Sequence, residues 1–398
     1  MSVESKAYPH NSTIAYPNSL PAANGTFIGI DCLSLPQHFS GAAYYIYHLT
    51  RNLLESTRPF SFAIFCKPVH RELFSRWLKP GDKLVSVPLS NRAAQLYFYE
   101  FRLRPLLIEA GIKIFYATHY ICPPQDPRYQ LVNTFHDMGF LLYPHFYPPV
   151  KRWYFGKRMR TFLQRTSHVV AVSHSTAASI GALFPEYRDK ISVIYPGTDH
   201  LLAAPEETPS ERAVAPPYIL AVNTLEIRKH TPFIVEVFDY LRHNFPCNHR
   251  LLIIGQRANG YHALRRAIRQ SPYRADILLK NTVSTARLMQ NYRECDFFIN
   301  ASVYEGFGFT PFEAIQFDCP VFLYRNNTVR EIIGNHPYTF PEMQAERWGE
   351  AIWKALNNRF VNRISRKDLQ SYSWKNTTHA TLNLFHKMLT GEETQVVH

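Results

Sequence analysis

The chain reads Ser302-Val-Tyr-Glu305-Gly306-Phe307-Gly308-Phe309-Thr310-Pro311-Phe312-Glu313-Ala314 at the point that decides its fold. The residues just before this segment, 296–300, form a short apolar and aromatic run that is typical of a buried strand. Gly306 and Gly308 allow the backbone a positive φ and let a ligand approach the main chain closely. The pattern therefore predicts a strand, a glycine-containing loop and a helix.

The helix after this loop has a start signal of its own. We expect Thr310 to be its N-cap, with Pro311 at a position where helices tolerate proline and residues 312–317 in helical conformation. The amides of the loop and the positive end of the helix together predict a site for an anion.

Two carboxylates, Glu305 and Glu313, lie on either side of that anion site in the sequence. A carboxylate beside a bound anion is costly unless the ligand also offers hydroxyl groups to bind. A sugar joined to a nucleoside diphosphate offers both kinds of group. For Glu313 a structural role is an equal alternative, because Thr310-Pro-Phe-Glu313 also has the spacing of a capping box.

The whole segment resembles the E-x7-E motif, EGFG-x-P-x-x-E-A, of the retaining glycosyltransferases of family 4. The resemblance implies the GT-B fold, an α/β architecture in which two doubly wound, Rossmann-like domains face a cleft. It also implies that Glu313 binds the ribose of a nucleotide-sugar and that Glu305 binds sugar hydroxyls near the anomeric carbon. It places the amides of Gly306, Phe307, Gly308 and Phe309 on the sugar, and it adds Thr310 to the residues that bind the donor.

A pair of cations follows the strand pattern 219–222. A bound diphosphate needs about two positive charges to offset it when no metal does, and Arg228 and Lys229 can supply them. A lone pair of this kind is most often surface decoration, but ligands of doubly wound sheets bind at the ends of such strands. The segment also resembles the family's G-x-L-x-P-R-K-N motif, in which both cations hold the donor diphosphate and Asn223 stands where the glycine is usual.

His136 and Asp137 follow another predicted strand, 131–135. For a lone His-Asp pair a turn capped by the aspartate is the commoner explanation. The resemblance instead implies that His136 lies across the cleft from Glu305 and hydrogen-bonds the donor, while Asp137 orients the ring or the loop.

The sequence departs from the family's pattern at several glycines. Gly41 matches the first glycine of the T-G-x-G-x-Y loop, which approaches phosphate and acceptor, but Ala43 replaces the second glycine while Tyr45 matches. Three further positions carry Asn or Asp, which tolerate left-handed φ better than other non-glycine residues, so we expect the turns to be kept. These positions are Asn223, Asn281 and Asp318.

The length of the chain and its alternation of predicted strands and helices indicate two domains. A chain of 398 residues is too long for one ordinary core, and predicted strands alternate with helices on both sides of a Pro- and charge-rich segment. We predict a leader, an acceptor-binding domain, a linker, a nucleotide-sugar-binding domain and a helix that crosses back with its tail. Their expected bounds are 1–25, 26–201, 202–217, 218–370 and 371–398.

The composition limits the partners. The formal charge of +13 favours phosphorylated ligands or an anionic membrane surface. The basic residues are scattered and form no long tail, so we expect no nucleic acid. The six cysteines are far apart in sequence, which fits free thiols in a reducing cytoplasm, and the chain shows no signal peptide and no membrane span. We expect a cytoplasmic protein, or one peripheral on the inner face of the membrane.

These observations lead to one predicted function and one alternative. The predicted function is metal-independent, retaining transfer of a sugar from a nucleotide-sugar to a glycan or lipid-linked acceptor. No cofactor is expected, since the chain has no D-x-D motif and no ligand set at metal-binding spacing. GDP-mannose is the candidate donor by analogy alone. The alternative is a non-catalytic binding protein on the same fold, with a degraded nucleotide site.

Overall fold

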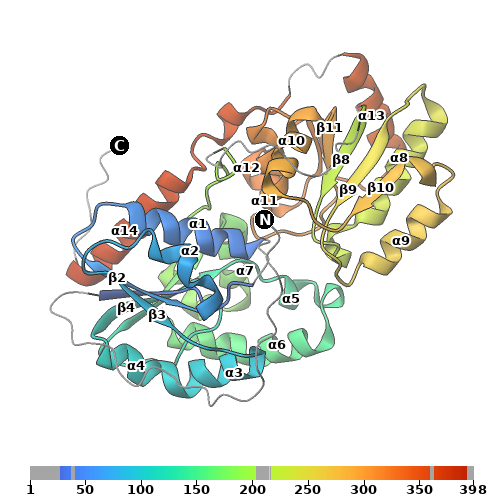
Figure 1. Ribbon diagram of the computed structural model, residues 1–398. Coiled ribbons are helices and arrows are strands. Elements are labelled where there is room, and N and C mark those ends of the chain that lie inside the picture. Colours follow the sequence, from blue (N-terminus) through green and yellow to red (C-terminus); the bar gives the residue numbers. More distant parts are fainter. Residues whose placement is uncertain (1–26, 37–40, 203–214, 216, 359–362, 392–398) are drawn as a thin grey trace.

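The computed structural model describes residues 27–36, 41–202, 215, 217–358 and 363–391. The expected leader and most of the expected linker lie outside the described residues. The described chain forms two parallel sheets with helices on both faces (Figure 1). The expected α/β architecture of two doubly wound domains is therefore confirmed.

The first sheet has seven parallel strands in the order β3-β2-β1-β4-β5-β6-β7. Its strands are the apolar runs that the sequence predicts, since both faces of such a sheet are covered by helices. They are β1 (Phe27–Asp31), β2 (Ser61–Cys66), β3 (Lys83–Ser86), β4 (Ile112–Ala117), β5 (Gln130–Phe135), β6 (His168–Ala171) and β7 (Ile191–Val193). The helices are α1 (Ala42–Glu55), α2 (Arg71–Ser75), α3 (Arg92–Tyr97), α4 (Leu103–Glu109), α5 (Gly139–Leu142), α6 (Pro149–Arg165) and α7 (His174–Leu183), with a π-helical segment, Phe98–Arg102, between α3 and α4.

The second sheet has six parallel strands in the order β10-β9-β8-β11-β12-β13. They are β8 (Tyr218–Val222), β9 (Arg250–Ile254), β10 (Ile277–Lys280), β11 (Phe297–Asn300), β12 (Val321–Tyr324) and β13 (Thr339–Phe340). The helices are α8 (Thr231–Asn244), α9 (Tyr261–Gln270), α10 (Thr285–Glu294), α11 (Phe309–Gln316), α12 (Asn327–Ile332), α13 (Ala345–Asn357) and α14 (Trp374–Thr390). Short 3-10 turns occupy Pro68–His70, Pro144–Phe146, Pro185–Lys190, Ile227–Lys229, Arg274–Asp276 and Arg366–Leu369.

Strand order fixes where a ligand can bind. In each sheet the order reverses once, between β1 and β4 in the first and between β8 and β11 in the second. Crevices at the carboxyl ends of strands open at such switch points. The segment 302–314 follows β11 directly, so it lies at the switch point of the second sheet.

The left-handed backbone positions differ in part from those expected. Among the described residues, His230 (φ 47°) and Asp318 (φ 55°) are the non-glycine residues with positive φ. Asp318 therefore adopts the left-handed conformation that the expectation allowed, whereas Asn223 and Asn281 do not. These two asparagines adopt ordinary backbone conformations that any residue can take, so the turns there do not need glycine.

The two domains meet through hydrogen bonds as well as packing. Glu331 of α12 accepts the amides of His174 and Ser175, at the start of α7, over 2.8 Å each. The Tyr195 hydroxyl donates to the same carboxylate. A carboxylate at a helix N-terminus satisfies unpaired amides and interacts favourably with the helix dipole, so Glu331 holds α7 from the opposite domain.

The C-terminal helix returns to the first domain. α14 packs along α1, and Figure 1 shows it running from the second domain over the first. The residues at the start of α14 form hydrogen bonds with the segment that connects the two sheets. The amide of Thr198 donates to the Tyr372 carbonyl over 2.8 Å, and the amide of Trp374 donates to Asp199 over 2.9 Å.

All six cysteines are buried free thiols, as the sequence predicts. Within the described residues no helix is long and apolar enough to span a bilayer.

Candidate active site

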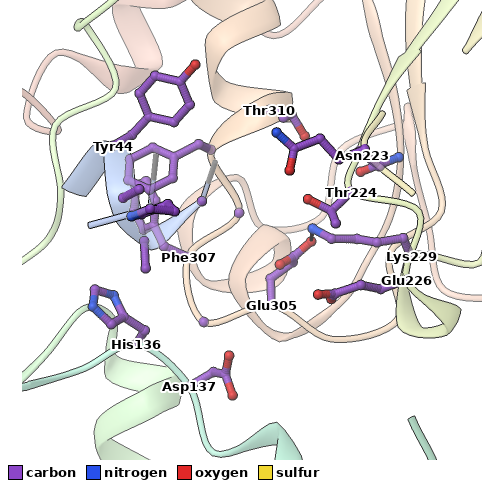
Figure 2. A pocket seen from close by; sticks show the side chains of 18 of the residues that line it. Tyr44, His136, Asp137, Asn223, Thr224, Glu226, Lys229, Glu305, Phe307 and Thr310 are labelled. Carbon is purple, nitrogen blue, oxygen red and sulfur yellow. Dashed lines mark hydrogen bonds and ion pairs between the residues drawn. The ribbon is translucent and has the colours of Figure 1, made fainter. Parts of the chain in front are cut away.

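A cleft of about 610 Å³ lies between the two domains. Its walls come from the carboxyl ends of β5, β8 and β11 and from the starts of α1 and α11. Figure 2 shows His136 and Asp137 on the side opposite Glu305 and Lys229. The predicted site residues therefore come together in one cavity, although they lie far apart in the sequence.

Glu305 binds both predicted cations. Its Oε2 accepts from Arg228 Nη1 over 2.7 Å, and its Oε1 pairs with Lys229 Nζ. The Ser302 hydroxyl also donates to Oε1, over 2.6 Å. Only 7% of Glu305 is exposed. Such a buried carboxylate is tolerated because its charge is paired and hydrogen-bonded.

The protonation of this group follows from opposing effects. Burial alone raises the pKa of Glu305, but the charges of Lys229 and Arg228 and the hydrogen bonds from Lys229 and Ser302 together lower that pKa to about 2. The carboxylate is therefore ionised at neutral pH. Burial lowers the pKa of Lys229, and the charge of Glu305 opposes that effect.

Arg228 has a second carboxylate partner. Its Nε donates to Glu226 Oε2 over 2.6 Å, and its Nη1 also donates to the Tyr304 carbonyl over 2.9 Å. The charges of Glu226, Arg228, Lys229 and Glu305 cancel one another. A diphosphate that enters the cleft must therefore draw the cations away from these carboxylates or use the loop amides.

The glycine loop touches the opposite domain. A Cβ on Gly306 would lie 1.5 Å from the backbone oxygen of His136, so only glycine permits this approach. The Gly306 carbonyl accepts the Ser173 hydroxyl over 2.7 Å. Gly308 has a φ of 84° and precedes α11. The loop thus brings the end of β11 against the end of β5.

The predicted start of the helix is wrong by two residues. α11 begins at Phe309, its N-cap is Gly308, and no side chain caps it. Thr310 is therefore inside the first turn, where it lines the cleft. The left-handed glycine turns the chain into the helix, so the Thr310 side chain is not needed for capping. The rings of Phe307 and Phe309 pack on other aromatic rings, and both residues line the cleft.

Glu313 does not form the capping box that was its structural alternative. It lines the cleft, accepts His200 Nε2 over 3.1 Å and accepts the Tyr292 hydroxyl over 2.9 Å. His200 comes from the connection between the two domains, and its Nδ1 has no partner. A carboxylate can accept about four hydrogen bonds, so Glu313 keeps acceptor capacity for a ligand hydroxyl.

His136 and Asp137 have separate partners. His136 Nε2 lies 2.8 Å from the Thr118 carbonyl. Because a carbonyl only accepts, Nε2 carries the proton and Nδ1 is left as an acceptor. Burial lowers the pKa of this histidine, so the ring is neutral at pH 7. Asp137 accepts the Gly139 amide over 2.9 Å, and so it orders the loop rather than the ring.

Asn223 and Gly41 also line the cleft, from opposite domains. Asn223 Oδ1 accepts Asn300 Nδ2 over 2.9 Å, and the buried Asn223 Nδ2 has no partner. Gly41 is the N-cap of α1, with a φ of 50°. Tyr45, which matches the family's loop, is fully buried, whereas its neighbour Tyr44 lines the cleft.

Several cleft residues were missed from the sequence. Glu226 is two residues from Arg228, so its proximity was a usable signal. Tyr44 gave no signal, and neither did His200, which binds Glu313 from behind the residues that line the cleft; the positions of both depend on how the two domains meet. The first domain also contributes Arg92, His119 and Lys151 to the wall.

Two family models match the chain in succession. The model for glycosyltransferase family 4 matches residues 39–200, and the model for glycosyl transferases group 1 matches residues 205–375. The chain belongs to the family 4-like glycosyltransferases. The resemblance noted in the sequence is thereby confirmed.

Two curated relatives of this glycosyltransferase carry O-antigen names. The O-antigen chain mannosyltransferase RfbU of Salmonella typhimurium is 24% identical over 328 residues, which cover 78% of this chain and 87% of that protein. The O-antigen chain mannosyltransferase B of Escherichia coli is 22% identical over 322 residues, covering 74% and 84%.

Solved structures share the fold of the glycosyltransferase. The sucrose-phosphate synthase of Thermosynechococcus elongatus has a TM-score of 0.69 at 14% identity, with 92% of this chain and 100% of that one covered. Anabaena Alr3699/HepE, solved in complex with UDP-glucose, has a TM-score of 0.64 at 13% identity, with 91% and 99% covered. The GT-B fold expected from the sequence is therefore confirmed.

Proposed function

We propose that this glycosyltransferase transfers a hexose from a nucleotide-sugar to a hydroxyl of a glycan or lipid-linked acceptor, with retention and without a metal. The observation that carries the proposal is the ion-paired group of Glu305, Arg228 and Lys229 facing His136 across the cleft. The names of the two O-antigen relatives support polysaccharide synthesis and make mannose, as GDP-mannose, the first donor to test.

Donor binding requires an exchange of partners. The diphosphate takes Arg228 and Lys229 from Glu305, and the released carboxylate then accepts hydroxyls of the sugar. The amides of the 306–309 loop add donors at the start of α11. Glu313 accepts the ribose hydroxyls through its remaining lone pairs, held in place by His200 and Tyr292.

The reaction breaks the bond between the anomeric carbon and the phosphate oxygen. The leaving diphosphate takes the electron pair, and Arg228 and Lys229 offset the charge that develops. The acceptor hydroxyl attacks from the same face and gives its proton to the leaving phosphate oxygen. The neutral His136 accepts a hydrogen bond from the sugar at Nδ1.

Thermal unfolding with nucleoside diphosphates and their sugars, with and without EDTA, tests donor binding. A ligand at 100 times its Kd stabilises the folded protein by about 2.7 kcal/mol, so the right nucleotide raises Tm by several degrees. Arg228→Gln with Lys229→Gln should abolish the rise, while Arg265→Gln on the exposed side of α9 should keep it.

Product analysis tests the chemistry. The anomeric configuration of the product, read by NMR, should equal that of the donor, and EDTA should leave the rate unchanged. An inverted product or a lost rate with EDTA contradicts the respective part of the proposal. A thermal shift with no donor turnover on any glycan or lipid-linked acceptor favours the non-catalytic alternative.

A further inference from the structure

Large apolar side chains are exposed on two neighbouring helical segments of the first domain. Tyr97 is 53% exposed and Phe101 is 63% exposed, at α3 and the π-helical segment. Val150 is 78% exposed and Trp153 is 62% exposed, on α6. We call these four residues the α3–α6 face. Single exposed apolar residues need no explanation, but aromatic side chains grouped on one layer do.

The two segments belong to one layer. Their buried sides, with Phe98 and Phe155 among them, join the same hydrophobic cluster under the first sheet. Glu100 of the π-helical segment is bound by Arg158 and by Arg165 of α6, over 2.8 and 2.7 Å. Figure 1 shows α3 and α6 next to each other. The exposed sides of both therefore point away from the same sheet.

The face is basic. α6 contains no acidic residue; its Arg158 and Arg165 pair with Glu100 and its Arg160 pairs with Glu186, and its other cations are Lys151, Arg152 and Lys157. The Lys157 ammonium lies 5.3 Å from the centroid of the Trp153 ring, so charge and aromatic surface occur together. α9 is also basic and without acidic residues, but it has no exposed large apolar residue among those described.

Exposed aromatic rings beside basic side chains fit the interface of an anionic bilayer. The rings enter the boundary between headgroups and acyl chains, and the cations bind the lipid phosphates. The face also reaches the cleft, because Arg92 and Lys151 line its first-domain wall.

We propose that the α3–α6 face docks on an anionic lipid bilayer and that an acceptor anchored in that bilayer enters the cleft past Arg92 and Lys151. The docking surface is independent of the proposed function, whereas the route of the acceptor rests on it.

Co-sedimentation with vesicles tests the surface. The full chain should bind vesicles of phosphatidylcholine with phosphatidylglycerol, bind phosphatidylcholine alone weakly, and be released by high salt. Phe101→Ser with Trp153→Ser should weaken binding, and Arg152→Gln with Lys157→Gln should weaken it roughly tenfold or more, since each cation near the surface contributes about 1 kcal/mol. Trp153 fluorescence should shift to the blue with anionic vesicles.

The matched control is Arg265→Gln with Arg266→Gln on α9, which removes the same charge. It should bind like the wild type. If the α9 and α6 charge variants lose vesicle binding equally, net charge alone explains the binding and the proposal is overturned. Full vesicle binding by the Phe101/Trp153 variant would also overturn it. A concentration-dependent dimer that this variant dissociates, without vesicle binding, would assign the face to a second copy of the chain.

Nucleotide-induced thermal shifts of the same variants separate the two proposals. The altered residues lie outside the cleft, so their shifts should equal that of the wild type. If the protein binds vesicles but no nucleotide raises its Tm, the docking surface stands and the proposed function is contradicted. If a nucleotide raises the Tm but the protein does not bind vesicles, the proposed function stands and the docking surface is contradicted.

Discussion

Glu305 stabilises the empty site through its ion pairs, and it is also a proposed ligand of the donor sugar. Its charge is buried, and it forms ion pairs with both Arg228 and Lys229. Removing one member of a buried ion pair leaves an uncompensated charge, which is far more costly than replacing the whole pair. The paired charges thus stabilise the site when it is empty, and the proposed function would free the carboxylate only when a diphosphate takes over the cations.

Glu305→Gln should lower the free energy of unfolding by about 3 kcal/mol at pH 7, because Lys229 then lies buried without an anion. Since folding lowers the pKa of Glu305 from 4.5 to about 2, its ionised form stabilises the protein fully above pH 4.5. That stabilisation is lost as the pH falls from 4.5 to about 2. Urea unfolding at several pH values should therefore show wild type and variant converging over this range.

Two variants serve as controls for this prediction. Adding Lys229→Met to Glu305→Gln removes both charges and should recover much of the stability but no activity. Glu55→Gln removes the exposed partner of Arg51 and should cost less than about 0.5 kcal/mol. A difference between wild type and Glu305→Gln that persists unchanged down to pH 2 would show that the carboxylate is not held by these cations.

At the scale of elements, the sequence predicted β5, β8 and β11 and the returning C-terminal helix. β8 and β11 are apolar runs that are buried on both faces, so a strand is the conformation that fits them. The start of α11 could not be predicted in the same way, because Thr310 fits a cap locally and only the approach of Gly306 to β5 requires the turn at Gly308. The hydrogen bond between Glu313 and His200 could not be predicted either, since it depends on how the second domain meets the connection between the domains.

Gly306→Ala tests that approach. Its Cβ would overlap the His136 backbone oxygen, which cannot move aside as a side chain would. We expect the loop to withdraw from β5, with kcat lowered at least tenfold, and stability lowered by about 1–3 kcal/mol as for overpacking. Gly156→Ala in α6 is the control, since nothing lies near its added Cβ, and it should be neutral or stabilise the helix by up to about 1 kcal/mol. Wild-type kcat in Gly306→Ala would contradict the close contact.

At the scale of the whole molecule, Glu331 joins the two domains by binding the first amides of α7. Glu331→Gln weakens the capping of α7, where a carboxylate contributes about 1–2 kcal/mol in a partly buried setting. We expect a larger radius of gyration by small-angle scattering and kcat lowered about five- to thirtyfold, with stability of each domain little changed. Bound nucleotide-sugar should partly restore the compact form. Identical scattering of variant and wild type would exclude Glu331 as a determinant of closure.

The polypeptide passes between the two sheets twice, after β7 and again before α14, and the hydrogen bonds of Thr198 and Trp374 fasten these passages to each other. The two connections between the sheets are therefore joined side by side, and a relative movement of the domains that separated them would break these hydrogen bonds. A movement that kept the bonds would turn about this place, and the parts of the cleft farthest from it would travel the greatest distance.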